Sequence, residues 1–404
     1  MSVRRTAPAR QSSLREHNLA LVLGEVAAAG SPSRARIAAA TGLTKATVSS
    51  LVDTLLEAGL VAEAGVDGGP RVGRPAAALT LSPAGPVGVG VEVNVDEVRA
   101  CVVDLAGAVL IRERVLGDLR GLPVAVVLER AAGVLRRVAA EATAGGRRLA
   151  GVGVAVPGLV EAGADGVRVA PNLGWQEVSV LPELRHLAAL GTDLPLRLDN
   201  EANLAALAEL WRGGHRDRAG RPLDTFVHVS GDVGVGAGLV VHGELLRGRH
   251  GFAGELGHVP VPGSDAPCAC GARGCLEQVA GQEAIARAAG LPPGTSVDVV
   301  LARALAGERS ALDAVAAAGT ALGVVLAGVL NLLDVDVVVL GGGYARLAPW
   351  LAPAVTRELR ARVLAVGARE VTVLPGLLGA DAAVLGAAGS VVRAVLAAPA
   401  RYAG

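Results

Sequence analysis

The segment Gly254–Glu277, GELGHVPVPGSDAPCACGARGCLE, gathers one histidine and three of the four cysteines of the chain in a Gly/Pro-rich stretch. One nitrogen and three sulfur donors are the set that a closed tetrahedral zinc site uses. These donors are His258, Cys268, Cys270 and Cys275. Because the protein would fill all four positions, we expect a structural zinc ion. Two alternatives stay open: unconnected buried thiols, and a disulfide, which the spacing of Cys268 and Cys270 disfavours.

Two carboxylates flank this segment. Glu255 lies just before His258, and Glu277 lies just after Cys275. If the four donors converge on a metal, both glutamates are held near each other on a rigid loop. Such carboxylates suit a polyhydroxylated ligand, because each oxygen can accept a hydrogen bond from a hydroxyl group. The alternative is a pair of surface glutamates that bind arginines.

Residues 1–82 predict a DNA-binding winged helix-turn-helix. After a helical pattern at Leu14–Ala29, residues 31–60 have apolar side chains at helical spacing around a turn at Gly42. Ser33 and Thr44 are good N-caps for the two helices. The second helix begins with small or polar groups, as a helix that enters the major groove requires. The candidate DNA contacts there are Thr44, Lys45, Ala46, Thr47, Ser49 and Ser50.

A Gly/Pro-rich tip between two apolar pieces follows this helix and predicts a β-hairpin wing. The tip carries Arg71 and Arg74, which could enter a narrow minor groove. Residues 1–87 hold nine Lys/Arg and six Asp/Glu, a net charge of +3 in a chain whose formal charge is zero. The alternative is a helical protein–protein module without DNA binding.

From residue 83 the pattern changes to short β-branched runs, glycines and helices, which predicts an α/β body. Within it, residues 194–210 predict a strand, a polar loop and a helix, and Cys101 lies in an apolar strand of the core. The strand-rich opening recurs, which suggests two similar lobes around a ligand-binding cleft. We place the first lobe at 83–198, completed by a C-terminal helix at 380–398, and the second lobe at 199–379.

The chain is expected in the cytoplasm and not in a membrane. The first residues, MSVRRTAPARQSS, are not followed by the apolar run of a signal peptide. The uncharged run Ala314–Leu333 has the length of a membrane span, but its glycines and the strand that follows favour a buried helix.

At this point the residues resemble a known family. Residues 254–277 match the ROK family (repressors, open reading frames, kinases) signature, G-E-x-G-H, a short spacer and C-x-C-G-x-x-G-C-x-E. Supporting matches are Pro157-Gly158, Asn172, DNEAN at 199–203 and VVLGGG at 338–343. The resemblance covers residues 86–395, and the winged helix is similar to that of the repressor branch, which includes xylose- and N-acetylglucosamine-responsive members. It implies an actin-like ATPase fold with two ribonuclease-H-like lobes.

The resemblance also implies a sugar site. Matched position by position, the sugar contacts of the family fall on Gly158, Asn172, Asn200, Glu201, Glu255, His258 and Glu277. His258 would then bind zinc and lie beside the sugar, so the metal would orient the sugar loop.

Two phosphate loops of the family's kinases are altered in this sequence. Glu92-Val93-Asn94-Val95-Asp96 stands in place of D-x-G-G-T, and Asp232-Val233-Gly234 stands in place of G-T-G. Glu201 stands at the position of the catalytic base, where the kinases have aspartate. Since phosphoryl transfer depends on holding and neutralising phosphates, we expect no catalytic residue and no ATP turnover.

The resulting hypothesis is a sugar-responsive repressor with operator DNA and a monosaccharide effector as partners. Paired half-sites require paired heads, so a homodimer or homotetramer is expected. The alternatives are an ATP-dependent sugar kinase with a DNA-binding head and a zinc-stabilised interaction module without a sugar ligand.

Overall fold

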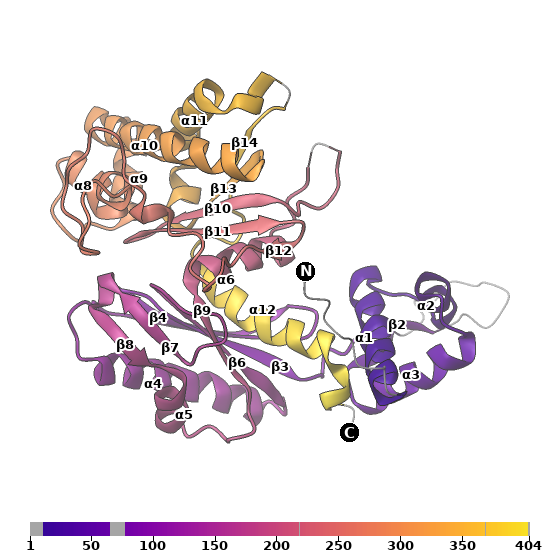
Figure 1. The fold of residues 1–404 in the computed structure, drawn as a ribbon. Helices are drawn as coiled ribbons and strands as arrows, with labels where there is room; N and C mark the ends of the chain where they lie inside the picture. The colour runs from indigo at the N-terminus through magenta and orange to yellow at the C-terminus, as the bar shows by residue number, and fades with distance from the viewer. Residues whose placement is uncertain (1–10, 65–76, 218, 368, 403–404) are drawn as a thin grey trace.

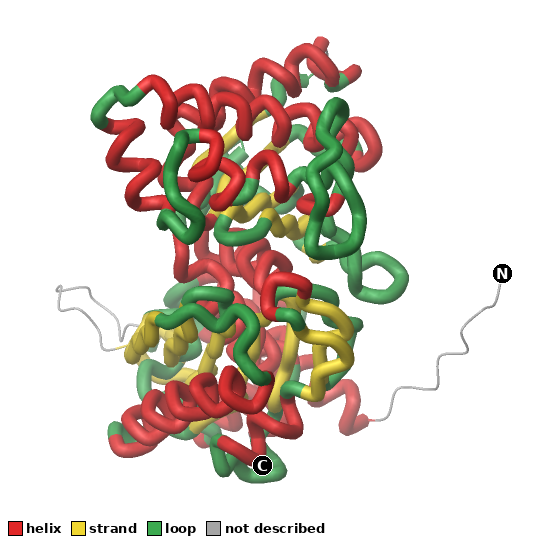
Figure 2. Tube along the Cα trace, turned by 90° about the vertical axis from the view of Figure 1, so that its left-hand side faces the viewer, coloured by secondary structure: helices red, strands yellow, loops and turns green. Residues whose placement is uncertain are grey.

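A computed structural model of the chain describes residues 11–64, 77–217, 219–367 and 369–402. It contains a small head and a body of two α/β lobes stacked one above the other (Figures 1 and 2). The winged helix-turn-helix and the two-lobed α/β body that the sequence predicts are thus confirmed.

Local N-cap hydrogen bonds define where the helices of the head begin. Its elements are α1 (Gln11–Ala29), α2 (Arg34–Thr41), α3 (Lys45–Glu57), β1 (Val61–Ala64) and β2 (Ala78–Leu81). Ser33 accepts a hydrogen bond from the Arg36 N–H at 3.3 Å, and Thr44 accepts one from the Thr47 N–H at 3.1 Å. Gly42 makes the turn between the two helices with φ of 73°. Strands β1 and β2 pair antiparallel as the wing.

The two lobes repeat one sheet topology. In each five-stranded sheet, three antiparallel strands are followed by two parallel ones, in the orders β5-β4-β3-β6-β9 and β12-β11-β10-β13-β14. The strands of the first sheet are β3 (Val87–Val93), β4 (Glu97–Val103), β5 (Val109–Leu116), β6 (Leu149–Val156) and β9 (Leu196–Asn200). Those of the second are β10 (Phe226–Gly231), β11 (Val235–Val241), β12 (Glu244–Leu245), β13 (Val337–Gly341) and β14 (Thr372–Pro375).

Helices and a small hairpin complete the first lobe. They are α4 (Val124–Ala144), β7 (Gly166–Ala170), η1 (Pro171–Leu173), β8 (Trp175–Ser179) and α5 (Leu181–Leu187). The core of this lobe is mainly valine, leucine and alanine, as a chain with 2% aromatic residues requires. Trp175 is an exception and is fully buried there.

The second lobe is richer in helix. Its helices are α6 (Glu201–Ala208), η2 (Glu209–Gly213), η3 (Leu256–His258), α7 (Glu277–Ala280), α8 (Gln282–Ala288), α9 (Val297–Leu305), α10 (Arg309–Leu333), α11 (Gly342–Arg362) and η4 (Leu364–Gly367). The predicted polar loop before α6 was wrong: Asn200 ends β9 and caps α6 directly, accepting from the N–H groups of Ala202 and Asn203.

Helix α10 and the segment Gly379–Ala397 are long and apolar enough to cross a membrane by length and composition, and 56% of each apolar window is buried inside the fold. Val315, Leu322 and Leu326 of α10 lie in the core of the second lobe, against α11. The buried environment of α10 matches the reading of Ala314–Leu333 as an interior helix.

The C-terminal segment links all three parts of the molecule. It comprises η5 (Gly379–Asp381), α12 (Ala382–Ala397) and η6 (Pro399–Tyr402). Helix α12 packs on β3 and β6 of the first lobe and against α6, and its far end meets α1 of the head (Figure 1). Leu19 and Leu23 of the head share one apolar cluster with Val391 and Val395 of α12. The buried thiol of Cys101 lies in the same cluster, so its core placement is as expected.

Candidate functional site

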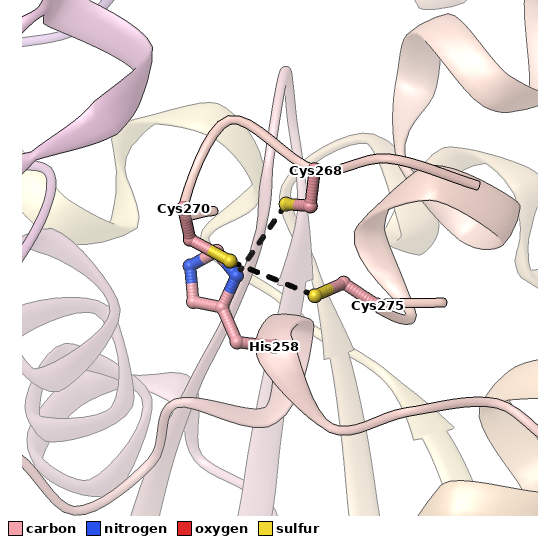
Figure 3. A group of neighbouring side chains, drawn as sticks. All are labelled: His258, Cys268, Cys270 and Cys275. Atoms are coloured by element: carbon pink, nitrogen blue, oxygen red, sulfur yellow. Dashed lines mark hydrogen bonds between the residues drawn. The ribbon is translucent and has the colours of Figure 1, made fainter. Parts of the chain in front are cut away.

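The four expected metal ligands converge. The ligand atoms of His258, Cys268, Cys270 and Cys275 all lie within 4.8 Å of one another, and their side chains point toward a common centre (Figure 3). Cys268 Sγ is 3.8 Å from His258 Nδ1, and Cys270 Sγ is 3.7 Å from Cys275 Sγ. The cysteines are free thiols, so the disulfide alternative does not hold in this structure.

The chemistry of this cluster fits a soft divalent cation. Burial, together with the neighbouring thiols, raises the pKa of Cys275 to about 12. Three crowded sulfurs cannot all ionise without a positive charge between them, and zinc supplies that charge and takes four N/S ligands. The Gln278 side-chain amide lies 3.7 Å from Cys268 Sγ and can donate to it.

His258 joins the cluster to the cleft between the lobes. Its Nδ1 faces Cys268, whereas its Nε2 lies 4.0 Å from Glu255 Oε2 on the cleft side. A metal on Nδ1 would fix the orientation of the imidazole and leave Nε2 as a donor toward the cleft.

The cleft has a volume of about 720 Å³ and is lined by both lobes. That volume is within the usual range for small-molecule sites. All seven predicted sugar contacts line it, namely Gly158, Asn172, Asn200, Glu201, Glu255, His258 and Glu277. The first lobe and the β9–α6 junction contribute the first four, and the zinc loop contributes the rest.

Hydrogen bonds position several of these side chains in advance. Asn200 Nδ2 donates to the Gly158 carbonyl at 2.9 Å, while its Oδ1 caps α6. Gly158 has φ of 94° and packs against the backbone of Ala170, so a side chain could not be accommodated there. Glu277 Oε2 accepts from Asn172 Nδ2 at 3.5 Å and from the Val235 N–H at 3.4 Å. These contacts bring both lobes to one carboxylate.

Glu201 is held as a buried acid at the first turn of α6. Burial raises its pKa well above the usual value, and the nearby carboxylates Glu92, Asp232 and Glu255 raise it further. Its Oε2 has no hydrogen-bond partner among the described residues. A buried polar atom of this kind is a ready contact for a ligand hydroxyl group.

The structure adds cleft residues that the sequence analysis missed. Trp175 lines the cleft and is 1% exposed, and its indole N–H has no partner within the described part of the chain. Buried indole N–H groups normally find an acceptor, so this group is a candidate ligand contact. Its signal in the sequence was faint: one of three tryptophans, three residues after Asn172. Gln176 and Ser230 also line the cleft.

Acidic side chains stand in the two stretches that the resemblance matches to the phosphate loops of the family's kinases. Asp232 Oδ1 accepts from the Gly343 N–H at 3.1 Å, at the N-terminus of the long helix α11. A helix N-terminus is a natural phosphate site, and here the protein's own carboxylate fills it. In β3 of the first lobe, burial raises the pKa of Glu92 to about 8.

A buried arginine compensates the charge behind Glu92. Arg99 lies opposite Glu92 in the β3–β4 pair and binds Glu97 and the Ala380 carbonyl. It also lies 3.2 Å from Asp381, just before α12. The guanidinium group of Arg99 is therefore already bound by other groups of the protein.

In the head, the predicted DNA contacts lie around the start of α3. Thr44, Lys45, Ala46 and Ser50 are exposed, and Thr47 and Ser49 are half-buried. Val48 between them is buried in the head core, which orients the polar groups outward. The predicted wing residues Arg71 and Arg74 lie outside the described residues.

Two family models match the chain. The model described as "ROK family" matches residues 88–393, and the model described as "MarR family" matches residues 20–69. The xylose repressor of Bacillus subtilis (strain 168) is 27% identical over 385 residues, which cover 95% of this chain and 97% of that protein.

Solved structures show the same architecture. A ROK family transcriptional regulator, described as a homologue of the E. coli MLC protein, superposes with a TM-score of 0.79 at 25% identity, covering 96% of this chain and 99% of that one. A ROK family glucokinase from Streptomyces griseus, in complex with glucose and AMPPNP, superposes with a TM-score of 0.62 at 25% identity, covering 75% of this chain and 98% of that one.

Proposed function

The chain belongs to the ROK family, and from this membership we propose that it is a sugar-responsive transcriptional repressor. It binds operator DNA through the winged helix and a monosaccharide in the cleft, without phosphoryl transfer. The observation that carries this proposal is one cleft that gathers seven polar or backbone contacts beside a metal cluster, in a chain with a winged-helix head.

The electrostatics of the cleft argue against ATP. A nucleotide would bring its phosphates to Glu92 and Asp232. Neither carboxyl group supplies the positive charge that phosphates need, and a carboxylate that ionises there would repel them. The N–H group of Gly343 that could bind a phosphate already binds Asp232. Phosphoryl transfer depends on neutralising phosphates, so we infer that catalysis has been lost. The kinase alternative predicts ATP turnover.

A mechanical route connects the sugar cleft to the head. Helix α6 begins at Glu201 in the cleft and packs against α12. The contact is backbone to backbone, because a Cβ at Gly386 would overlap the Leu204 carbonyl. Helix α12 in turn shares its apolar cluster with the head. A sugar that favours one arrangement of the lobes would therefore move the heads relative to each other.

The four candidate metal ligands would support sugar recognition in this proposal. His258, Cys268, Cys270 and Cys275 would hold a structural zinc ion, which would fix His258 and Glu255 for hydroxyl recognition. Paired operator half-sites call for a homodimer or homotetramer. We place the protein in the cytoplasm, where operator DNA is found and where thiols remain reduced.

Calorimetric titration of the zinc-loaded protein tests the proposal. The panel is xylose, glucose, N-acetylglucosamine, their 6-phosphates and ATP, with xylose first because of the Bacillus subtilis relative. One sugar should bind without ATP and change operator affinity. Glu277→Gln should abolish that binding, whereas Glu308→Gln, on an exposed glutamate outside the cleft, should not. Turnover of ATP would overturn the proposal in favour of a kinase.

A further inference from the structure

A second groove, outside the sugar cleft, runs beside the C-terminal half of α12. Its volume is about 780 Å³, and its walls are the start of β6, the chain before β9, α12 and η6. Four arginines line it, Arg148, Arg197, Arg393 and Arg401, whereas Asp193 is the one acidic residue in its lining. The groove thus concentrates positive charge in a chain whose formal net charge is zero.

This charge is not compensated internally. None of the four arginine side chains has an ion pair or a hydrogen bond within the described part of the chain, although Arg148 lies over the Tyr402 ring and Arg393 over the Trp211 ring. Exposed arginines elsewhere commonly bind carboxylates, as Arg303 binds Glu308 and Arg362 binds Glu358. The arginines of the groove therefore have no carboxylate partner among the described residues, although the Arg393 guanidinium group lies against Trp211, which is not part of the groove lining.

The apolar walls of the groove strengthen the electrostatic field of its arginines. Leu149, Leu194, Val391 and Ala394 contribute apolar walls beside the arginines. Walls of low polarity focus the field of like charges and raise the local concentration of a counter-ion. The Tyr402 hydroxyl donates to the Ala150 carbonyl at 3.2 Å, which ties η6 to β6 and keeps the groove formed.

We propose that this groove binds a small phosphate-bearing anion. The guanidinium group presents paired N–H donors that match phosphate oxygens, so several arginines around one concave site select phosphate over neutral ligands. The volume suits a small molecule such as a phosphorylated metabolite. A concave, partly apolar groove favours this class of ligand over the convex backbone of DNA.

The position of the groove gives such a ligand a consequence. Helix α12 and η6 both contact α1, and Tyr402 packs against the cluster that holds Leu19 and Leu23 of the head. An anion in the groove would stabilise the position of α12 and η6, which contact α1 of the head. It would thus act as a second effector, independent of the sugar.

Inorganic pyrophosphate serves as the probe, titrated calorimetrically into the zinc-loaded full chain at constant ionic strength. We expect saturable binding by the wild type. Arg197→Ala and Arg401→Ala remove exposed side chains without described partners, so folding should be unaffected and binding should weaken about tenfold or more. Arg309→Ala is the matched control, because Arg309 is exposed and unpaired in the described chain but starts α10 in the other lobe.

Three results would overturn the proposal: no saturable binding by the wild type, unchanged binding by both groove variants, or equal weakening by Arg309→Ala. Operator titrations at several salt concentrations add a separate readout. If pyrophosphate does not bind but both groove variants lose operator affinity and salt dependence, the groove contacts the DNA backbone instead. That outcome also rejects the small-anion site.

Discussion

Replacing Gly386 by alanine should separate the two helices that connect the sugar cleft to the head. Gly386 lies in α12, where it faces α6. A Cβ there would lie closer to the Leu204 carbonyl oxygen than real Cβ atoms lie to their neighbours. The obstacle is backbone, which cannot rotate away as a side chain can. The helices must therefore move apart.

The magnitude follows from two opposing terms. Gly→Ala inside a helix gains about 1 kcal/mol from helix propensity. Overpacking a well-filled contact costs about 1–3 kcal/mol and sometimes more, and a clash with backbone belongs at the upper end. We expect a net loss of about 2 kcal/mol for Gly386→Ala. Gly328→Ala in α10, where a Cβ would meet nothing within 4 Å, should instead gain about 0.5–1 kcal/mol.

Gly389→Ala provides an intermediate test. A Cβ there would lie 3.2 Å from the Trp211 ring, a side chain that can shift by a few tenths of an ångström, so the two terms should nearly cancel. Urea unfolding followed by circular dichroism measures all three variants. Equal stability of Gly386→Ala and Gly328→Ala would refute the packing argument. A folded Gly386→Ala variant should also respond less to sugar in operator binding.

Three further variants test other parts of the molecule. Glu92 has a raised pKa of about 8 in the folded protein, against an ordinary 4.5, so folding stability should fall as pH rises between these values. Glu92→Gln should match the wild type near pH 4 and exceed it by about 4 kcal/mol at pH 8 in urea unfolding. Equal stability at both pH values would show that Glu92 ionises normally. Cys270→Ser should lose bound zinc, measured by elemental analysis, and with it the sugar response; Cys101→Ala should keep both, and normal sugar response in Cys270→Ser would separate the metal from the sensor. Arg74→Ala should weaken operator binding severalfold in a gel-shift titration and leave sugar affinity unchanged, and an unaltered operator affinity would contradict the wing assignment.

Local chemistry made much of this fold predictable. The helix caps at Ser33 and Thr44 act within three residues of their partners, so the sequence alone reveals them. The four donors of the candidate metal site span 18 positions, His258 to Cys275, and their softness and number already indicate a tetrahedral site. The repeat of the strand pattern also predicted two lobes, and both sheets have the same topology.

Contacts between segments far apart in the chain could not be predicted from the sequence. Asp232 and Gly343 are far apart in sequence, and only the folded sheet brings the carboxylate to the helix N-terminus. Trp175 enters the cleft because a small hairpin places it there, and in the sequence only its position three residues after Asn172 hints at this. The meeting of α6 with α12 likewise depends on the path of the whole chain.

The shared cluster of Leu19, Leu23, Val391 and Val395 bears on modular engineering. A chimeric sensor can be made by joining the DNA-binding domain of one protein to the ligand-binding domain of another. Here the DNA-binding domain is not self-contained, because α12, near the C-terminus of the chain, supplies part of its hydrophobic core. A graft cut near residue 82 would leave apolar surface bare on both fragments. The transferable unit is the head together with α12, so new specificities are best installed by rewriting α3 in place.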